Sequence, residues 1–339
     1  MDDLPSERFV LAGVGAIGSF GAGKDAIKEL LALGPGSHLS TQQPQKKLAF
    51  PLSTARLHDF IPPHRLRRAD HFSKLALTAL MLALDDAGLA PEECQNSALL
   101  VASGYGPVAS TCSFKDSYLD HGTLGASPTM FTKSIHNQAA AHIAIQLGVQ
   151  GPVATVCQHS FPFQMALLTG CLWLREKRVQ RVLVGGVDEL TPFFEYCRRR
   201  YATSAENRVD ALLAISDAAP GEGAAFFILE AETKRFPQTT LAMPVLGTLD
   251  DERLPFANQG CLAVHGPRPA DNEWLRGQYD NYQHVDFRPL YGHYPTAAAL
   301  DLAALTTVLP TYGQGTSIET GFRRHFACLR LETRETKEV

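Results

Sequence analysis

The chain has 339 residues, of which 45% are apolar and 19% are charged, and its formal net charge is -4. A chain of this length can bury a large core, either as one domain or as two closely packed halves. Its acidic balance excludes nucleic acid as a partner, and because no apolar run approaches the roughly 18 residues of a spanning helix, we expect a cytoplasmic protein without signal peptide or membrane insertion.

Strands and helices are predicted to alternate from the beginning of the chain. Residues 9–17 have the composition of a β-strand, and residues 24–33 have the apolar spacing of a helix. Residues 36–62, rich in Pro, Gln, His and Ser, show no period, and we expect a surface excursion there. Asp70 is a candidate N-cap for a long Ala/Leu-rich helix that continues through Ala87.

The alternation continues toward the middle of the chain. Buried strands and one Ala-rich helix are predicted at residues 99–104, 137–147, 182–186 and 223–230. This order favours an α/β sandwich built on a mostly parallel sheet. A charged stretch that contains proline, residues 231–244, divides the chain into a first half, residues 1–235, and a shorter second half, residues 236–339.

The cysteines show neither a disulfide pattern nor a metal-binding pattern. Their number is odd, and none is in C-x-x-C spacing. We therefore expect reduced, mostly buried thiols and no metal site. The seven cysteines are Cys94, Cys112, Cys157, Cys171, Cys197, Cys261 and Cys328.

A sharp turn near residue 160 is the most informative local feature. A strand-like run leads directly into an apolar helix, residues 163–174, and Ser160 stands at the turn between them. Such an elbow exposes a side chain, and the helix dipole stabilises negative charge there. The run is Gly151-Pro152-Val153-Ala154-Thr155-Val156-Cys157-Gln158-His159-Ser160-Phe161.

This run resembles the active-site strand of the β-ketoacyl synthases of the thiolase fold, which reads G-P-x-x-T-V-x-T-A-C. In that family the acyl-accepting cysteine follows the glycine by nine residues, and here the same position is Ser160. A carbanion attacks a thioester far more readily than an oxygen ester. The resemblance therefore raises the question of whether this chain is an enzyme.

The resemblance extends in order over most of the chain. Matching stretches lie at residues 8–21, 70–89, 127–137, 185–189 and 221–225. It implies a thiolase-like, layered α/β/α/β/α sandwich of two similar halves. His265 and His293 occupy the two catalytic histidine positions of the family.

The departures from the family pattern lie at positions that take part in catalysis in that family. Pro267 and Pro269 replace two threonines after the first histidine, which removes backbone donors and hydroxyls. Arg288 replaces a lysine, and its guanidinium does not release a proton at neutral pH. Arg323 and Arg324 stand in the loop that the family writes G-F-G-G-x-N, where they would crowd an oxyanion hole.

The resemblance is strongest to chain-length factors, the subunits of type II polyketide ketosynthases that lack the cysteine. It implies a non-catalytic subunit that pairs with an active β-ketoacyl-ACP synthase and shapes its acyl or polyene tunnel, as in aryl polyene-type biosynthesis. An acyl carrier protein would be the second partner, and we expect no tightly bound cofactor, because the carrier's phosphopantetheine would enter through the active subunit. Tunnel and interface residues would be Phe131, Asn137, Cys157, His159, Phe161, Phe163 and Phe322.

We expect particular roles for some of these residues in shaping the tunnel and binding a partner. His159 is expected to plug a cavity, and shrinking Phe161 or Phe163 is expected to lengthen the product. A short basic run, Arg198-Arg199-Arg200, could meet an acidic carrier protein.

The alternative is a serine acyltransferase or thioesterase acting on acyl-carrier-protein thioesters. In it Ser160 would be the nucleophile, and His265 or His293 would be the general base. An ordinary condensing enzyme is a third interpretation, but it needs a thiol at the elbow. Cys157 lies three residues too early on the strand, where side chains alternate between faces.

Overall fold

The computed structural model of the protein describes residues 7–32, 51–202, 219–231, 238–249, 260–266, 269–321 and 324–334. Its strands are β1 (Arg8–Gly18), β2 (Gly21–Ala22), β3 (Ala98–Ser103), β4 (Val153–Cys157), β5 (Arg181–Asp188), β6 (Gly223–Ala231), β7 (Gln238–Ala242), β8 (Val245–Thr248), β9 (Cys261–His265), β10 (Gln283–Val285), β11 (Gln314–Thr320) and β12 (His325–Arg334).

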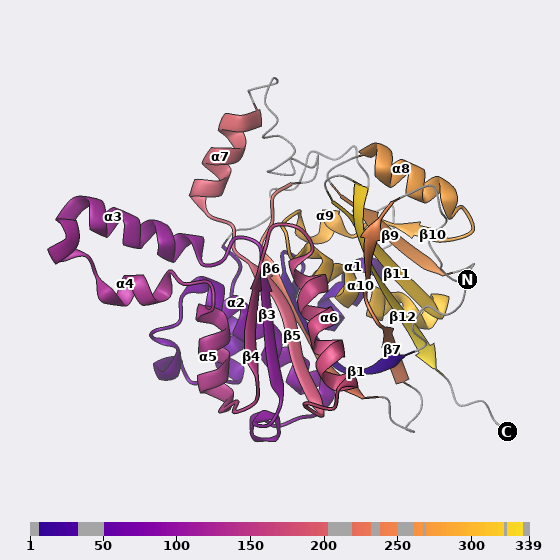
Figure 1. Ribbon diagram of the computed structural model, residues 1–339, viewed down its shortest axis with the longest axis horizontal. Coiled ribbons are helices and arrows are strands. Elements are labelled where there is room, and N and C mark those ends of the chain that lie inside the picture. The colour runs from indigo at the N-terminus through magenta and orange to yellow at the C-terminus, as the bar shows by residue number, and fades with distance from the viewer. Residues whose placement is uncertain are drawn as a thin grey trace.

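The helices alternate with these strands, as Figure 1 shows. They are α1 (Lys24–Ala32), α2 (His71–Ala87), α3 (Val108–Gly125), α4 (Pro128–Lys133), α5 (Gln138–Leu147), α6 (Pro162–Arg175), α7 (Pro192–Ala202), α8 (Pro269–Gln278), α9 (Arg288–Tyr291) and α10 (Ala297–Tyr312). Short 3-10 helices are η1 (Ala55–Asp59), η2 (Pro63–Leu66) and η3 (Pro91–Cys94).

The sheet consists of two similar halves. Its strand order is β10-β9-β11-β12-β7-β1-β6-β5-β3-β4. In the first half β4, β3 and β5 are parallel, and β6 and β1 continue antiparallel. In the second half β10, β9 and β11 are parallel, and β12 and β7 continue antiparallel. The antiparallel pair β1 and β7 joins them.

The prediction of a mostly parallel sheet is wrong. Among the strand pairs of the described residues, seven are antiparallel and four are parallel. Strands covered on both faces read as continuous apolar runs whatever their direction. The buried antiparallel strand β6 therefore looks, in sequence, like the parallel strands beside it.

Helices lie outside and between the two halves of the sheet. α2 and α5 pack on the outer face of the first half. α6 and α10 lie between the halves, and α10 contacts both β6 and β11. α8 covers the outer face of the second half. This arrangement is the layered α/β/α/β/α sandwich expected for a thiolase-like fold.

The boundaries of α2 follow from local chemistry. The Asp70 carboxylate caps the helix by accepting a hydrogen bond from the Ser73 N–H at 2.8 Å, and Gly88 ends it with a left-handed φ of 65°. On the facing strand, a Cβ at Gly15 would lie 2.1 Å from the Ala79 carbonyl oxygen. Glycine in β1 thus lets the strand approach the helix closely.

Two further predictions concern a surface excursion and the boundary between the two halves of the chain. Of the surface excursion predicted at residues 36–62, residues 36–50 lie outside the described residues. Within residues 51–62, Leu52, Leu57 and Ile61 are buried beside α2 and not on the surface. The boundary predicted between residues 235 and 236 lies outside the described residues. No helix of the described chain is long and apolar enough to cross a membrane.

Residues 108–137, here called the arm, project from the body of the molecule (Figure 1). The arm comprises α3, which is broken at Gly122 where φ is 68°, and α4. Not one of its residues is buried. Its exposed large apolar side chains are Tyr118, Leu119, Leu124, Met130, Phe131 and Ile135. An apolar surface of this kind marks an interaction site.

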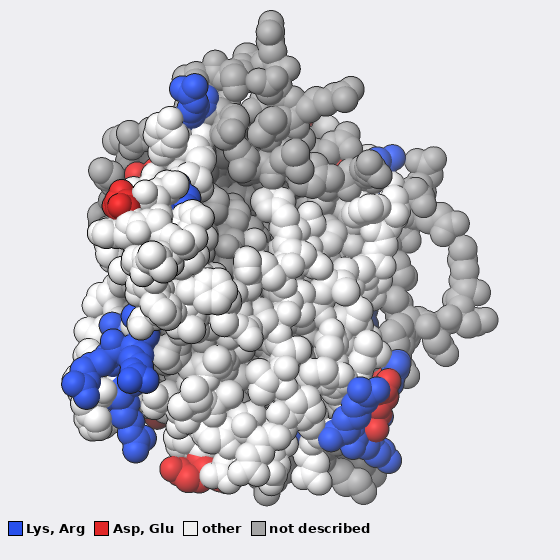
Figure 2. All heavy atoms as spheres, turned by 60° about the vertical axis from the view of Figure 1, so that its left-hand side comes forward, with Lys and Arg blue, Asp and Glu red and all other residues white. Residues whose placement is uncertain are grey.

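The apolar surface continues onto the neighbouring edge of the sheet. β4 pairs only with β3 among the described strands, and its Val153 is 44% exposed. On the adjacent α5, Ile145 is 75% exposed. Figure 2 shows that most of this face carries neither acidic nor basic side chains. An open, apolar edge strand is a template for pairing with another chain.

Candidate functional site

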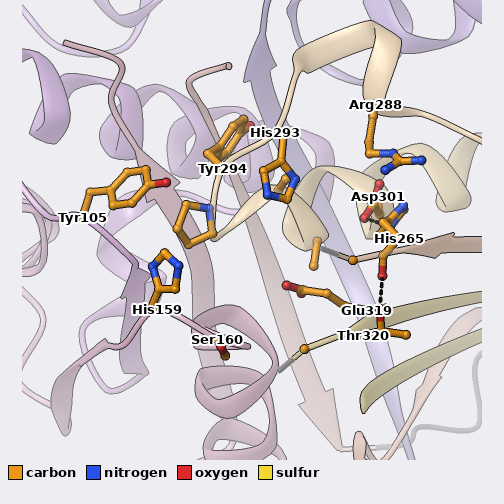
Figure 3. Close-up of a pocket in the computed structure, with 15 residues that line it drawn as sticks. Tyr105, His159, Ser160, His265, Arg288, His293, Tyr294, Asp301, Glu319 and Thr320 are labelled. Atoms are coloured by element: carbon orange, nitrogen blue, oxygen red, sulfur yellow. Dashed lines mark hydrogen bonds and ion pairs between the residues drawn. The ribbon is translucent and has the colours of Figure 1, made fainter. Parts of the chain in front are cut away.

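A small cavity lies where the two halves of the chain meet (Figure 3). Its volume is about 40 Å³, and because a single water needs roughly 10–15 Å³ of such space, the cavity has room for only a few water molecules. Ser160, His265 and His293 all line it, so the structure brings these predicted residues together. The other lining residues are Tyr105, His159, Gly266, Arg288, Tyr294, Pro295, Ala297, Ala298, Asp301, Glu319, Thr320 and Gly321.

The elbow between β4 and α6 has the predicted shape. Ser160 directly precedes Phe161, which has a left-handed φ of 56° at the N-terminus of α6. This conformation is strained for a residue with a side chain. The Gln158 side-chain amide fixes the turn by donating a hydrogen bond to the Ser160 carbonyl oxygen at 2.8 Å.

Two phenylalanines after the elbow fill space. Phe161 is 7% exposed, and its ring lies against Gly321, where an added Cβ would be 2.7 Å from the ring tip. Phe163 is fully buried in the core, with its ring centroid 5.5 Å from that of Phe227. Phe161 therefore covers backbone beside the cavity, whereas Phe163 faces the layer between the sheet halves.

His265 forms a buried ion pair with Asp301. Its Nε2 contacts the Asp301 carboxylate, which also accepts a hydrogen bond from the Tyr291 hydroxyl. Burial alone would lower the pKa of His265, but the charge of Asp301 and its hydrogen bond outweigh that effect, so the pKa is raised. Asp301 therefore favours the cationic form of His265.

The pKa of His293 is shifted in the opposite direction to that of His265. Its backbone N–H donates to the Ala219 carbonyl oxygen at 2.8 Å, which fixes the residue against the 219–221 segment. Burial, and then the positive charges of Arg288 and His265, lower the pKa of His293 to about 4. At neutral pH His293 is thus neutral, whereas the Asp301 carboxylate favours the cationic form of His265.

Arg288, which replaces the family's lysine, is committed to another partner. Its guanidinium forms two hydrogen bonds of 2.9 Å with the Asp286 carboxylate. This fork geometry is the strongest that arginine makes with a carboxylate. Arg288 contributes charge to the cavity but does not serve as a proton donor there.

Sequence reasoning missed the acidic side chains of the cavity. Asp301 is the one acidic residue of α10, an otherwise apolar and hydroxyl-bearing helix, and that isolation was a readable signal. Glu319 lies on β11 and accepts a hydrogen bond from the Gln164 side chain at 2.5 Å. Burial raises the pKa of Glu319 to about 7, although Gln164 opposes the shift. Nothing in the local sequence around Glu319 distinguishes it from an ordinary strand residue.

The described residues place neither a general base nor a thiol at the elbow. Within the described residues, the Ser160 hydroxyl has no hydrogen-bond partner, so neither histidine is placed as its base. Cys157 is exposed at the end of β4, does not line the cavity, and has its pKa raised by partial burial. His159 lines the cavity, with its ring centroid 6.2 Å from that of Tyr105.

The remaining predicted residues are spread more widely. Phe131, 54% exposed, and Asn137 lie on the arm rather than at the cavity. Arg324 stacks over Trp274 at 5.6 Å. Phe322 lies outside the described residues, as do Pro267, Arg268, Arg323 and the side chains of Arg198 and Arg199. In the described part of the chain, no group of three His, Cys, Asp or Glu side chains is placed to hold a metal ion.

The sequence of the chain matches one family over most of its length. The family is described as "Beta-ketoacyl synthase, N-terminal domain", and the match covers residues 8–235. The chain belongs to the β-ketoacyl synthase family.

Curated relatives match over a shorter span. The chain is 25% identical over 154 residues to 3-oxoacyl-[acyl-carrier-protein] synthase 2 of Staphylococcus aureus strain COL, which is 43% of this chain and 37% of the relative. The same enzyme of strain MRSA252 is 26% identical over 152 residues. The aligned region thus spans about a third of the length of these relatives.

Solved structures show the same fold over nearly the whole chain. The ishigamide ketosynthase/chain length factor has a TM-score of 0.73 at 15% identity, covering 97% of this chain and 99% of that chain. AntDE:AntF, a type II PKS acyl-carrier protein in complex with its ketosynthase bound to the hexaketide, has a TM-score of 0.75 at 17% identity, with 97% and 99% covered. A β-ketoacyl synthase from Burkholderia phymatum STM815 has a TM-score of 0.73 at 17% identity, with 97% and 100% covered.

Proposed function

We propose that this chain is a non-catalytic chain-length factor. It pairs with an active β-ketoacyl-ACP synthase and closes the partner's acyl or polyene tunnel, in type II polyketide biosynthesis of the aryl polyene kind. The observation that carries the proposal is the cavity at the elbow. Ser160 stands where condensation needs a thiol, no cysteine lines the cavity, and its volume of about 40 Å³ leaves no room for an acyl chain.

The arm and the open edge of β4 support a heterodimer. Between residues 108 and 137 no side chain is buried, although several are large and apolar. Such a segment gains too little from its own contacts to offset the entropy of ordering, and a partner subunit would supply the missing burial. A protein similar in fold is itself a ketosynthase/chain length factor.

The described surface also offers a place for an acidic carrier protein. Arg65, Arg67 and Arg68 are exposed in and after η2, and none of them forms an ion pair with a described residue. We assign the carrier contact to these arginines, because their charge is uncompensated among the described residues. The carrier's phosphopantetheine would then reach the partner's thiol, and this chain would need no cofactor of its own.

A reconstituted synthase tests the absence of catalysis by this chain. With the active subunit and the carrier protein present, we expect Ser160→Ala to make polyene at the wild-type rate, because no bond to substrate forms at Ser160. The matched control is the active subunit with its nucleophilic cysteine changed to Ala, which should abolish the product. Product is quantified by absorbance and mass spectrometry.

The same assay can also contradict the proposed non-catalytic role. Complete loss of product with Ser160→Ala, at unchanged heterodimer content, would show that the serine carries an acyl group. Phe131→Ala supplies a second readout. Because Phe131 is exposed on the arm, we expect Phe131→Ala to lengthen the product. Because Phe163 is buried in the core, we expect Phe163→Ala mainly to reduce folding, in place of the longer product expected from the sequence.

A further inference from the structure

The arm has little to hold its direction. Its helices contact each other, through a Phe114–Phe131 ring pair at 5.3 Å and a 3.3 Å hydrogen bond from the Thr111 hydroxyl to the Ser134 carbonyl oxygen. None of its residues is buried against the body. Because packing of an apolar face is what usually fixes a helix, the direction of this arm is set where its two ends join the body. At one end the His136 ring lies against Gly106, and the root, at the other end, is the start of α3.

Two carboxylates of the body meet the root of the arm. The Ala109 N–H donates a hydrogen bond to Glu189 Oε1 at 2.8 Å, and the Ser110 hydroxyl donates to Asp70 Oδ2 at 3.0 Å. Pro107, at the N-cap position of α3, supplies no side-chain cap. Glu189, which follows the end of β5, therefore provides the acceptor that the N-terminus of α3 lacks.

Glu189 is an unfavourable residue to bury without such a role. It is 3% exposed, and no ion pair of the described residues includes it. Its pKa is raised to about 7, mainly by burial and also by the charges of Asp70 and Glu222, whereas the bond from Ala109 and the charge of His71 oppose the shift. A buried carboxylate with no cation bonded to it is costly, and its bond to the first turn of α3 is the contact that offsets this cost.

We propose that Glu189 is a positioning residue that fixes the direction of the arm and thereby presents the arm's apolar side chains to a partner subunit. The presentation to a partner rests on the proposed function, whereas the fixing of the arm does not. Glu189→Ala leaves the Ala109 N–H without its acceptor. Glu189→Gln keeps an acceptor oxygen of the same reach and should restore most of the effect.

Hydrogen exchange on the purified full chain tests the first part. We expect Glu189→Ala to speed exchange of the amides of residues 109–125 by about fivefold, as for the loss of a helix cap, while exchange in α2 stays unchanged. Glu189→Gln should lie close to wild type. The control is Glu92→Ala, which removes an exposed carboxylate in η3, away from the arm. Wild-type exchange of the arm in Glu189→Ala, or equal acceleration in α2, would overturn the proposal.

Affinity for the active ketosynthase tests the second part. By biolayer interferometry we expect Glu189→Ala to weaken the heterodimer by at least fivefold, mainly through slower association of a misdirected arm, and Glu189→Gln to recover it. Equal affinity of all variants would refute the role in presentation. If wild type binds no ketosynthase while the arm still loosens in Glu189→Ala, the proposed function fails and the positioning role stands.

Discussion

At the scale of single residues, the charge of His265 depends on the Asp301 carboxylate. The pKa of His265 is raised in the folded protein, so the stabilisation from this pair is fully present below its ordinary value of 6.5 and is lost as pH rises through the folded value. We expect Asp301→Asn to lower the free energy of unfolding by about 3 kcal/mol at pH 6 and by clearly less at pH 9.

Urea unfolding at the two pH values checks this difference. Glu230→Gln is the matched control, because its partner Arg181 is charged at both pH values and the loss should not vary. An equal loss for Asp301→Asn at pH 6 and pH 9 would mean that Asp301 does not raise the pKa of His265.

Part of this cavity could be predicted from sequence and part could not. Ser160, His265 and His293 were found because each sits in a local pattern with fixed spacing. Asp301 and Glu319 were missed because their importance comes from tertiary neighbours, His265 on β9 and Gln164 on α6. The opposite pKa shifts of the two histidines likewise depend on burial and on the charges of Asp301 and Arg288, which spacing alone does not reveal.

At the scale of elements, the start of α6 packs against Gly321, between β11 and β12. The Phe161 ring covers Gly321, and an added methyl there would come within 2.7 Å of the ring. We expect Gly321→Ala to lower the free energy of unfolding by about 2 kcal/mol through overpacking. In a Phe161→Ala background the same change should cost almost nothing, because the space has been vacated.

Thermal and urea unfolding of the two single variants and the double variant measure this coupling. Gly277→Ala in α8 is the control, since no atom lies within 4 Å of the added methyl, and we expect it to be neutral or stabilising. Additive losses in the double variant would show that Phe161 does not fill the space beside Gly321.

Elements with local end signals were predictable, and those decided by the whole sheet were not. Asp70 and Gly88 delimit α2 by capping chemistry that sequence displays directly. The direction of β6 is set by its antiparallel neighbours β1 and β5, far away in sequence, so a buried apolar run gave no information about it. Leu57 and Ile61 were assigned to a surface because they lie in a segment rich in polar residues without a period.

At the scale of the whole molecule, the chain is an α/β sandwich with one unfinished side. The arm without a buried residue, the open edge of β4 and the exposed Ile145 of α5 lie on that side. The cavity beside Ser160, by contrast, is small, at about 40 Å³, and its side chains bond to one another and to neighbouring residues. A small cavity beside Ser160 and an exposed apolar side suit the proposed role, in which this chain binds another subunit and completes its tunnel.

Native mass spectrometry of this chain, co-expressed with a cysteine-containing ketosynthase and supplied with acyl carrier protein substrate, tests this account most directly. The account predicts a one-to-one heterodimer in which only the ketosynthase gains the mass of an acyl group. A homodimer of this chain that carries acyl mass on Ser160 would contradict it.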